Sequence, residues 1–312
     1  MNITRNYMAR NMQENIHLNK KRLLGITCLL ITVLLFSSYE VVNKLIIGKV
    51  GALQLNFLRF FIGGFILFLI LVIRKDVKIT PRLFLRAGLV GIINVVVSMG
   101  FLQLAHASQE SKASVVAVIF SSNPIFVVLI CALIGREKLT LRKTIGMIIG
   151  FTGVVVALTD SFDIATVLKI SSLYALLSAL FYAIYTVYGR AATESLGSLK
   201  MNAYSFLIGS VCLIPILLIK GEHVFVFDVS AIPYVIYLSV FVSGLAYFTY
   251  FIGLKIVGVG MGSLVFFLKP VISSIFAFFI LGESITINLI LGIILILAGI
   301  GIAREREKKI DH

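Results

Sequence analysis

The sequence predicts an all-α integral membrane protein in which ten transmembrane helices form two inverted five-helix repeats. Of the 312 residues, 59% are hydrophobic and 13% are charged, whereas a soluble domain carries roughly 25% charged residues. Most of the chain consists of apolar runs that approach the ~20 residues needed to cross a bilayer. The second half also repeats residue types of the first at a constant offset of 146 residues, the separation of Pro124 and Pro270.

The ten apolar runs follow one another with short connections, so neighbouring spans are expected to be antiparallel. In chain order the spans cover about residues 23–47, 54–73, 83–105, 113–134, 141–159, 169–190, 201–219, 231–252, 259–281 and 287–303. The first run is too long for a signal-peptide core and has no small-residue cleavage site, so it is assigned as a span. The chain then divides into an N-terminal tail (1–22), a first repeat (23–159), a second repeat (169–303) and a C-terminal tail (304–312).

Lysine and arginine residues gather on one side of the predicted bundle. With a cytoplasmic N-terminus, the inner segments hold 21 of them and the outer loops hold four. Cytoplasmic loops of membrane proteins carry this excess, so both termini are expected in the cytoplasm. The same clusters account for the net charge of +14 without a nucleic-acid partner. No transit or retention signal is visible, which favours the plasma membrane.

Motifs of cofactor, metal and enzyme chemistry are missing from the sequence. The three cysteines, Cys28, Cys131 and Cys212, lie inside apolar runs without CxxC spacing. They are expected to be packing residues, not disulfide partners or metal ligands. No His/Cys/Asp cluster has metal-ligand spacing, and no dinucleotide fingerprint, P-loop or nucleophile elbow occurs. We therefore expect no cofactor, no metal and no enzymatic activity, and an ATP-driven pump is disfavoured.

Matched proline, glutamate, threonine and glycine residues define the internal repeat. The pairs are Pro124 with Pro270, Glu137 with Glu283, Thr140 with Thr286, Gly63 with Gly209, Gly146 with Gly292 and Gly153 with Gly299. Each glutamate ends a span and is expected to be structural, and each threonine is expected to cap the next helix. Because five spans per repeat is an odd number, the second repeat must be inverted, about a pseudo-two-fold axis in the membrane plane.

Glycines in the fifth and tenth spans resemble the small-residue faces through which membrane helices pack. They predict that these two spans pack together. The contact could lie within one chain or between the two chains of a homodimer.

The sequence around Lys269 has the chemistry of a site within the membrane. Lys269 lies near the middle of the ninth span, where an ammonium costs several kcal/mol unless it faces a polar cavity or a partner. Pro270 removes a helix hydrogen bond and exposes a carbonyl about four residues earlier. The repeat mate is Asn123 followed by Pro124, so the two halves share a helix break and differ in chemistry. Lys269 is expected to bind a substrate, and the alternative is a lysine paired for packing alone.

A second polar group is expected in the outer half of the bundle. Glu40 and Lys44 lie on one face of the first span, and Arg59 lies near the outer end of the second. A carboxylate near two cations is held in its charged form, so Glu40, with Arg59 as its partner, can serve coupling only if the site opens and closes. Arg59, Lys44, Pro124 and Pro270 are further candidates for coupling or gating. In the structural alternative, Glu40 pairs with Lys44 one turn away, and Arg59 extends toward the outer surface.

Three tyrosines, Tyr39, Tyr185 and Tyr247, lie on spans expected to line a cavity. A ring with a hydroxyl suits the wall of a substrate site, although tyrosine also anchors helices at membrane interfaces. His106, near the outer end of the third span, is expected to be a solvated residue at the edge of a loop.

One short pattern recurs in both halves and carries a family resemblance. In each half a proline is followed thirteen residues later by a glutamate and three residues after that by a threonine. Together with the segment from Phe36 to Lys44 and with Leu58-Arg59-Phe60, the pattern resembles the EamA-type repeat of the drug/metabolite transporter superfamily over about residues 23–305. Ser37 and Glu40 depart from the family pattern, and Ser205 stands where the first repeat has Arg59.

The resemblance implies ten helices in two inverted repeats, alternating access, and ATP-independent movement of small organic solutes, often the export of amino acids. We therefore expect a permease for a small polar metabolite, with spans 1–4 and 6–9 around a cavity and spans 5 and 10 outside. Lys269 would bind a substrate carboxylate, with Asn123 donating hydrogen bonds opposite. The alternatives are efflux of drugs or lipophilic cations, a non-transporting membrane scaffold and an intramembrane enzyme.

Overall fold

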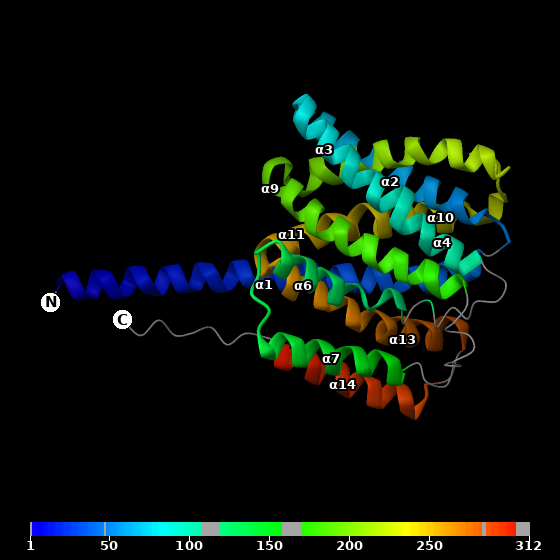
Figure 1. Cartoon of the computed structure of the whole chain (residues 1–312). Coiled ribbons are helices and arrows are strands. Elements are labelled where there is room, and N and C mark those ends of the chain that lie inside the picture. Colours follow the sequence, from blue (N-terminus) through cyan, green and yellow to red (C-terminus); the bar gives the residue numbers. More distant parts are fainter. Residues whose placement is uncertain are drawn as a thin grey trace.

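The computed structural model describes residues 2–46, 48–107, 116, 119–157, 170–282 and 285–303, with N-terminal side chains from residue 18 onward. Within these ranges the chain consists of helices joined by turns, without a strand, which confirms the all-α class. Six helical stretches are long and apolar enough to cross a membrane. The helices form an elongated bundle in which α1 begins and α14 ends on the same side (Figure 1). The count of ten crossings stays a prediction.

Each predicted span of the first half contains a helix, and three of these described stretches are long and apolar enough to cross a membrane. Its elements are α1 (Asn2–Leu45), α2 (Ala52–Ile73), α3 (Pro81–Gly91), the π-helical η1 (Ile92–Ser98), α4 (Met99–Ala107), α6 (Asn123–Leu133) and α7 (Leu141–Ala157). The helix α1 begins well before the first predicted span, so its N-terminal part protrudes from the bundle (Figure 1). The α3, η1 and α4 segments together make one predicted span.

In the second half, the long helix α9 turns at a glycine. Gly197 has φ 72° inside α9 (Ile170–Ile219), and this turn separates the predicted sixth and seventh spans. The remaining elements are η3 (Val229–Ala231), α10 (Ile232–Tyr237), the π-helical η4 (Leu238–Ala246), α11 (Tyr247–Val257), α12 (Val259–Ser263), the 3-10 helix η5 (Leu264–Leu268), α13 (Lys269–Leu281) and α14 (Ile287–Ala303). Glu283 lies outside the described residues.

Equivalent helix contacts occur twice, once for each repeat. The π-helical segments η1 and η4 begin at Ile92 and Leu238, which are 146 residues apart. A Cβ on Gly63 of α2 would lie 2.7 Å from the carbonyl oxygen of Ser239 in η4, and one on Gly209 of α9 would lie 2.6 Å from that of Gly91, next to η1. Glycine is needed at both positions because the backbones approach this closely. The internal repeat found in the sequence therefore recurs in the packing.

The helices α7 and α14 pack on each other at the side of the bundle (Figure 1). A Cβ on Gly146 would lie 2.6 Å from the carbonyl oxygen of Gly299, and one on Gly153 would lie 2.8 Å from that of Gly292. The predicted glycine contact between the fifth and tenth spans is confirmed, and it lies within one chain.

We predict that Gly299→Val destabilises the protein by about 1–3 kcal/mol, the usual cost of overpacking. A Cβ at this position would lie 2.4 Å from the backbone nitrogen of Gly150, so α7 and α14 would have to separate. Gly301→Val is the matched control on the same helix, because no atom lies within 4 Å of a Cβ there. Thermal unfolding of the purified protein in detergent measures the difference, and equal midpoints for the two variants would contradict the packing.

Two connections from different repeats meet at the predicted outer end. The backbone nitrogen of Gln54 donates to Glu222 Oε2 (2.9 Å), and its side-chain amide donates to the carbonyl of Val226 (3.0 Å). The backbone nitrogen of Asp228 also donates to the carbonyl of Lys49 (3.2 Å). These bonds tie the segment after α1 to the segment after α9.

Candidate binding site at the helix breaks

The chain breaks its helices at the two prolines that the sequence singled out. Pro124 lies in the first turn of α6 and Pro270 in the first turn of α13, where the missing N–H costs nothing. A turn precedes Asn123, and the 3-10 helix η5 precedes Lys269. The predicted break is therefore confirmed in both halves. It leaves Asn123 and Lys269 as the first residues of new helices inside the bundle.

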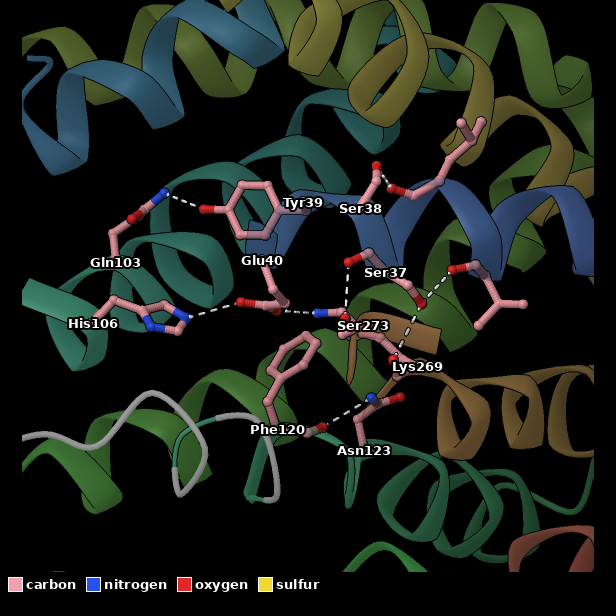
Figure 2. Close-up of polar contacts among 12 residues, drawn as sticks. Ser37, Ser38, Tyr39, Glu40, Gln103, His106, Phe120, Asn123, Lys269 and Ser273 are labelled. Atoms are coloured by element: carbon pink, nitrogen blue, oxygen red, sulfur yellow. Dashed lines mark hydrogen bonds and ion pairs between the residues drawn. The ribbon is translucent and has the colours of Figure 1, made fainter. Parts of the chain in front are cut away.

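Lys269 forms an ion pair with Glu40. Its Nζ donates to Glu40 Oε1 at 2.6 Å, and the two side chains are only 9% and 18% exposed (Figure 2). The backbone reinforces this contact, because the Ser37 hydroxyl donates to the carbonyl of Lys269 (3.2 Å) and the Ser273 hydroxyl donates to that of Ser37 (2.8 Å). Glu40 is thus bonded by a residue of α13 on the second repeat, whereas Lys44, one turn away, has an exposed side chain near the end of α1.

His106 belongs to the same polar group. Its Nε2 lies 3.8 Å from Glu40 Oε2, and its side chain is 13% exposed. The expectation of a solvated residue at a loop edge is therefore wrong. Gln103, one turn earlier on α4, donates to the Tyr39 hydroxyl at 2.7 Å. Figure 2 shows that α4 directs both side chains toward Tyr39 and Glu40 of α1.

Arg59 is buried, which contradicts the structural alternative in which it extends toward the outer surface. Only 3% of the residue is exposed. Its Nε and Nη2 donate to Asn56 Oδ1 at 3.3 and 3.1 Å, and Asn56 is fixed in turn by donating to the carbonyl of Val95 at 2.8 Å. The guanidinium lies 4.8 Å from the ring centroid of Tyr39 and 4.4 Å from that of Phe60. Contacts of this kind stabilise a cation away from water.

The polar residues border a small cavity between the two repeats, which is partly open. The lining residues are Phe36, Tyr39, Arg59, Met99, Leu102, Phe120, Tyr182, Val242, Tyr247, Phe266 and Lys269. They come from the predicted spans 1–4, 6, 8 and 9, whereas α7 and α14 contribute none of them. This distribution agrees with the expected cavity, except that the seventh span does not line it.

The three predicted tyrosines occupy different positions around this cavity. Tyr39 and Tyr247 line it. Tyr185 is fully buried behind the wall, with its ring centroid 5.6 Å from that of Tyr182 and 6.1 Å from that of Tyr247. The Tyr185 hydroxyl has no hydrogen-bond partner among the described residues.

Most of the aromatic wall was not singled out from the sequence. Phe36 packs on Tyr247 with ring centroids 4.8 Å apart and on Phe266 at 5.6 Å, and Phe120 packs on Tyr182 at 5.3 Å. The chain has 24 phenylalanines, so no single one is distinctive. The spacing of Tyr182 and Tyr185, three residues apart on one helical face, was an available signal.

Asn123 is not among the residues that line the cavity, and part of its amide is already used by Phe120 (Figure 2). Its Nδ2 donates to the carbonyl of Phe120 at 2.9 Å, just before the start of α6. Its Oδ1 is buried without a hydrogen-bond partner among the described residues. The amide thus closes the helix break on one side and leaves an acceptor on the other. Within the described ranges, no group of three His, Cys, Asp or Glu residues could hold a metal ion.

A second buried carboxylate joins the two repeats at the end of the bundle from which α1 protrudes. Glu137, in the connection after α6, accepts a hydrogen bond from the backbone nitrogen of Gly260 in α12 (2.8 Å) and pairs with Lys143 (3.3 Å). The predicted structural role of Glu137 agrees with these contacts.

The predicted caps are confirmed, because Thr140 accepts from the backbone of Lys143 and Thr286 from that of Leu289.

We predict that Glu137→Ala destabilises the protein by about 1.5–3 kcal/mol, the range for hydrogen bonds to a charged group. The substitution removes the acceptor of the Gly260 N–H, a first-turn donor of α12 that has no partner inside its helix. Glu194→Ala, which removes a more exposed carboxylate paired with Arg190, is the control and should change the unfolding midpoint little. Equal losses in the two variants would show that the Gly260 contact is not important.

Comparison with known proteins places this geometry among membrane transporters. The model of the EamA-like transporter family matches residues 23–159 and again residues 169–304. An uncharacterized transporter of Clostridium kluyveri is 30% identical over 302 residues, which cover 91% of this chain and 94% of that protein. The uncharacterized transporter YoaV of Bacillus subtilis is 27% identical over 293 residues, covering 90% and 95%. A solved crystal structure matches with a TM-score of 0.73 at 22% identity, over 91% of this chain and 97% of that one, and supports the fold.

Proposed function

Because this chain belongs to the EamA-like transporter family, we propose that it is a secondary transporter for a small polar metabolite that carries a carboxylate. Export of amino acids or related compounds is the activity that we expect. The protein would lie in the plasma membrane, with ten spans in two inverted repeats and both termini in the cytoplasm. The excess of lysine and arginine on one side supports this orientation.

The observation that carries the proposal is the ion pair of Glu40 and Lys269 at the edge of the shared cavity. Charged side chains inside a membrane are costly and usually mark a substrate or ion pathway. A substrate carboxylate would replace Glu40 at Lys269, and a substrate ammonium would then bind Glu40. Asn123 would complete the site with its amide. Tyr39 and Tyr247 would form the wall, and Tyr185 would support it from behind.

Alternating access would move the two repeats about this pair. Glu40 comes from the first repeat and Lys269 from the second, so their ion pair links the two repeats. A substrate that replaces this ion pair would therefore change the contact between the repeats. The breaks at Pro124 and Pro270 would serve as hinges, since helix ends absorb changes in backbone angles. Glu40 is also the candidate coupling site, with His106 beside it. Arg59 and the exposed Lys44 are the remaining gating candidates of the sequence analysis.

The rival functions have less support. Efflux of lipophilic cations needs a carboxylate available to the substrate, but Glu40 already bonds Lys269, and Arg59 adds a second cation to the lining. An intramembrane enzyme needs a nucleophile next to a base, and the lining residues include no serine, cysteine or histidine. A scaffold has no need for a charged pair at a cavity.

The first test is metabolite analysis of cells and medium by mass spectrometry. Cells that express the wild-type chain are compared with cells that carry no copy and with cells that express Lys269→Met at the same membrane level. The proposal expects one class of carboxylate-bearing solute to leave the wild-type cells faster than both others. If no amino acid, organic acid or related solute differs, export of this class is excluded.

A further inference from the structure

We propose that Arg59 binds the anionic group of the substrate, and that the preferred substrate is an organic monoanion with an apolar, planar body. This inference rests on the proposed transport function and changes its substrate class, from an amino acid to a carboxylate without an ammonium group. Lys269 would keep its bond to Glu40 while such a substrate occupies the cavity. The sequence-based expectation, in contrast, gave the carboxylate to Lys269.

The charges around the cavity are unbalanced. The lining contains two cations, Arg59 and Lys269, and no carboxylate. Glu40 neutralises Lys269 at 2.6 Å. Within the described part of the chain, no carboxylate forms an ion pair with Arg59. Among the described residues that line the cavity, one positive charge is therefore not balanced by an ion pair, and a solute of net charge −1 would neutralise it.

The geometry of Arg59 leaves one edge of the guanidinium available. Asn56 Oδ1 accepts from both Nε and Nη2, so the Nε–Nη2 edge of the guanidinium is occupied by this amide. No hydrogen bond from Nη1 to a described residue is present, although only 3% of Arg59 is exposed. Tyr39 and Phe60 hold the guanidinium from their ring faces. An arginine fixed in this way presents the Nη1–Nη2 edge, which matches the two oxygens of a carboxylate.

The remaining wall selects the body of the substrate. Besides Arg59 and Lys269, the lining consists of apolar and aromatic residues, with Phe36, Tyr182, Tyr247 and Phe266 close to one another. Aromatic side chains favour offset or edge contacts with another flat ring. A second charge on the substrate would have to be buried against this wall without a free partner. A single carboxylate on a flat apolar body meets both conditions.

A net charge of −1 would also supply a driving force for export. A membrane potential that is negative inside drives an anion outward, and moving one charge through 100 mV is worth about 2.3 kcal/mol. Export of such a solute would therefore require neither ATP nor a coupling ion.

Three compounds that share a phenylethyl group test the charge preference. These are 3-phenylpropanoate (net charge −1), phenylalanine (zwitterion) and phenethylamine (net charge +1), each measured by equilibrium binding to the purified full-length protein in detergent. We expect 3-phenylpropanoate to bind at least about tenfold more tightly than phenylalanine, and phenethylamine to bind weakest. If phenylalanine or phenethylamine binds the wild-type protein as tightly as 3-phenylpropanoate does, the proposal is overturned.

Variants then assign the preference to Arg59. Arg59→Gln should abolish the tenfold preference, and Arg59→Lys should retain part of it, since a lysine keeps the charge without the two-pronged geometry. Arg82→Gln, on the exposed start of α3, is the control and should bind as the wild type does. A full preference in Arg59→Gln would overturn the assignment. If that variant does not fold, Arg59→Lys and the wild-type order still decide the question.

Flux measurements separate this inference from the function on which it rests. The wild-type protein is placed in vesicles, and a potassium gradient with valinomycin sets the membrane potential. Faster movement of 3-phenylpropanoate toward the positive side supports both statements. Binding in the expected order without any flux leaves the Arg59 assignment intact and contradicts transport. Flux of phenylalanine with no preference for the anion supports transport and contradicts the Arg59 assignment.

Discussion

Glu40→Gln alone is expected to destabilise the protein by about 3–5 kcal/mol, because it leaves the buried ammonium of Lys269 without its carboxylate. Lys269→Met should cost less, since the carboxylate of Glu40 would still have His106 at 3.8 Å and the positive charge of Arg59 nearby. The double variant Glu40→Gln/Lys269→Met should recover much of the loss, since it buries no unpaired charge. Denaturation of the purified proteins in detergent measures all three.

The exposed ion pair of Arg190 and Glu194 provides the control for this comparison. Its nitrogen and oxygen atoms are 2.9 Å apart, but the glutamate side chain is 57% exposed. Glu194→Gln should therefore change the free energy of unfolding by no more than about 1 kcal/mol. If Glu40→Gln costs as little as Glu194→Gln, the Glu40–Lys269 pair does not contribute to the stability of the bundle.

The second large effect concerns transport itself. Once a substrate is identified, Lys269→Met is expected to lower its flux in vesicles by about 30-fold or more. Truncating one partner of a buried charge pair costs about 2–5 kcal/mol, and each 1.4 kcal/mol corresponds to about a factor of ten. The double variant Glu40→Gln/Lys269→Met should fold better than Glu40→Gln and still fail to transport.

The double variant decides whether the pair serves function or packing. Wild-type flux in this variant would show that Glu40 and Lys269 are a structural pair, the alternative that the sequence left open. Lys255→Met is the matched control, because Lys255 is exposed in the last turn of α11 and should not affect flux. A loss of flux in Lys255→Met would mean that removal of any lysine on this face impairs the protein.

Much of the fold could be predicted because its signals are local. An apolar run of about 20 residues has one low-energy state in a bilayer, a helix in which all backbone hydrogen bonds are made within the segment. Proline cannot donate to a helix ladder, so the breaks before α6 and α13 followed from Pro124 and Pro270. The glycines of α7 and α14 have a characteristic spacing, and the structure brings the two helices together through them.

The members of the candidate site were predicted better than their partners. Lys269, Glu40 and Arg59 are conspicuous in apolar spans because a charged side chain is costly to bury in a membrane and usually has a partner or a function there. Their contacts join residues far apart in the chain, such as Glu40 with Lys269 at a separation of 229 residues. From the sequence, Arg59 and the helical neighbour Lys44 were the two candidate partners of Glu40, because both lie on the same or the adjacent span. His106 was wrongly predicted to be solvated for the same reason. Hydropathy shows that His106 lies at the end of a span, but it does not show which residues of other helices bury its side chain.

The sequence by itself determined that this chain is a helical membrane protein, where its helices break, and which charged residues lie in apolar surroundings. The order of the chain and the properties of each residue are sufficient for those conclusions. Only the tertiary structure decided that Lys269 neutralises Glu40, that Arg59 is buried without a described carboxylate partner, and that aromatic side chains of both repeats enclose the cavity. Those properties depend on which helix faces meet, and the free energy of that choice is spread over many small contacts between distant residues.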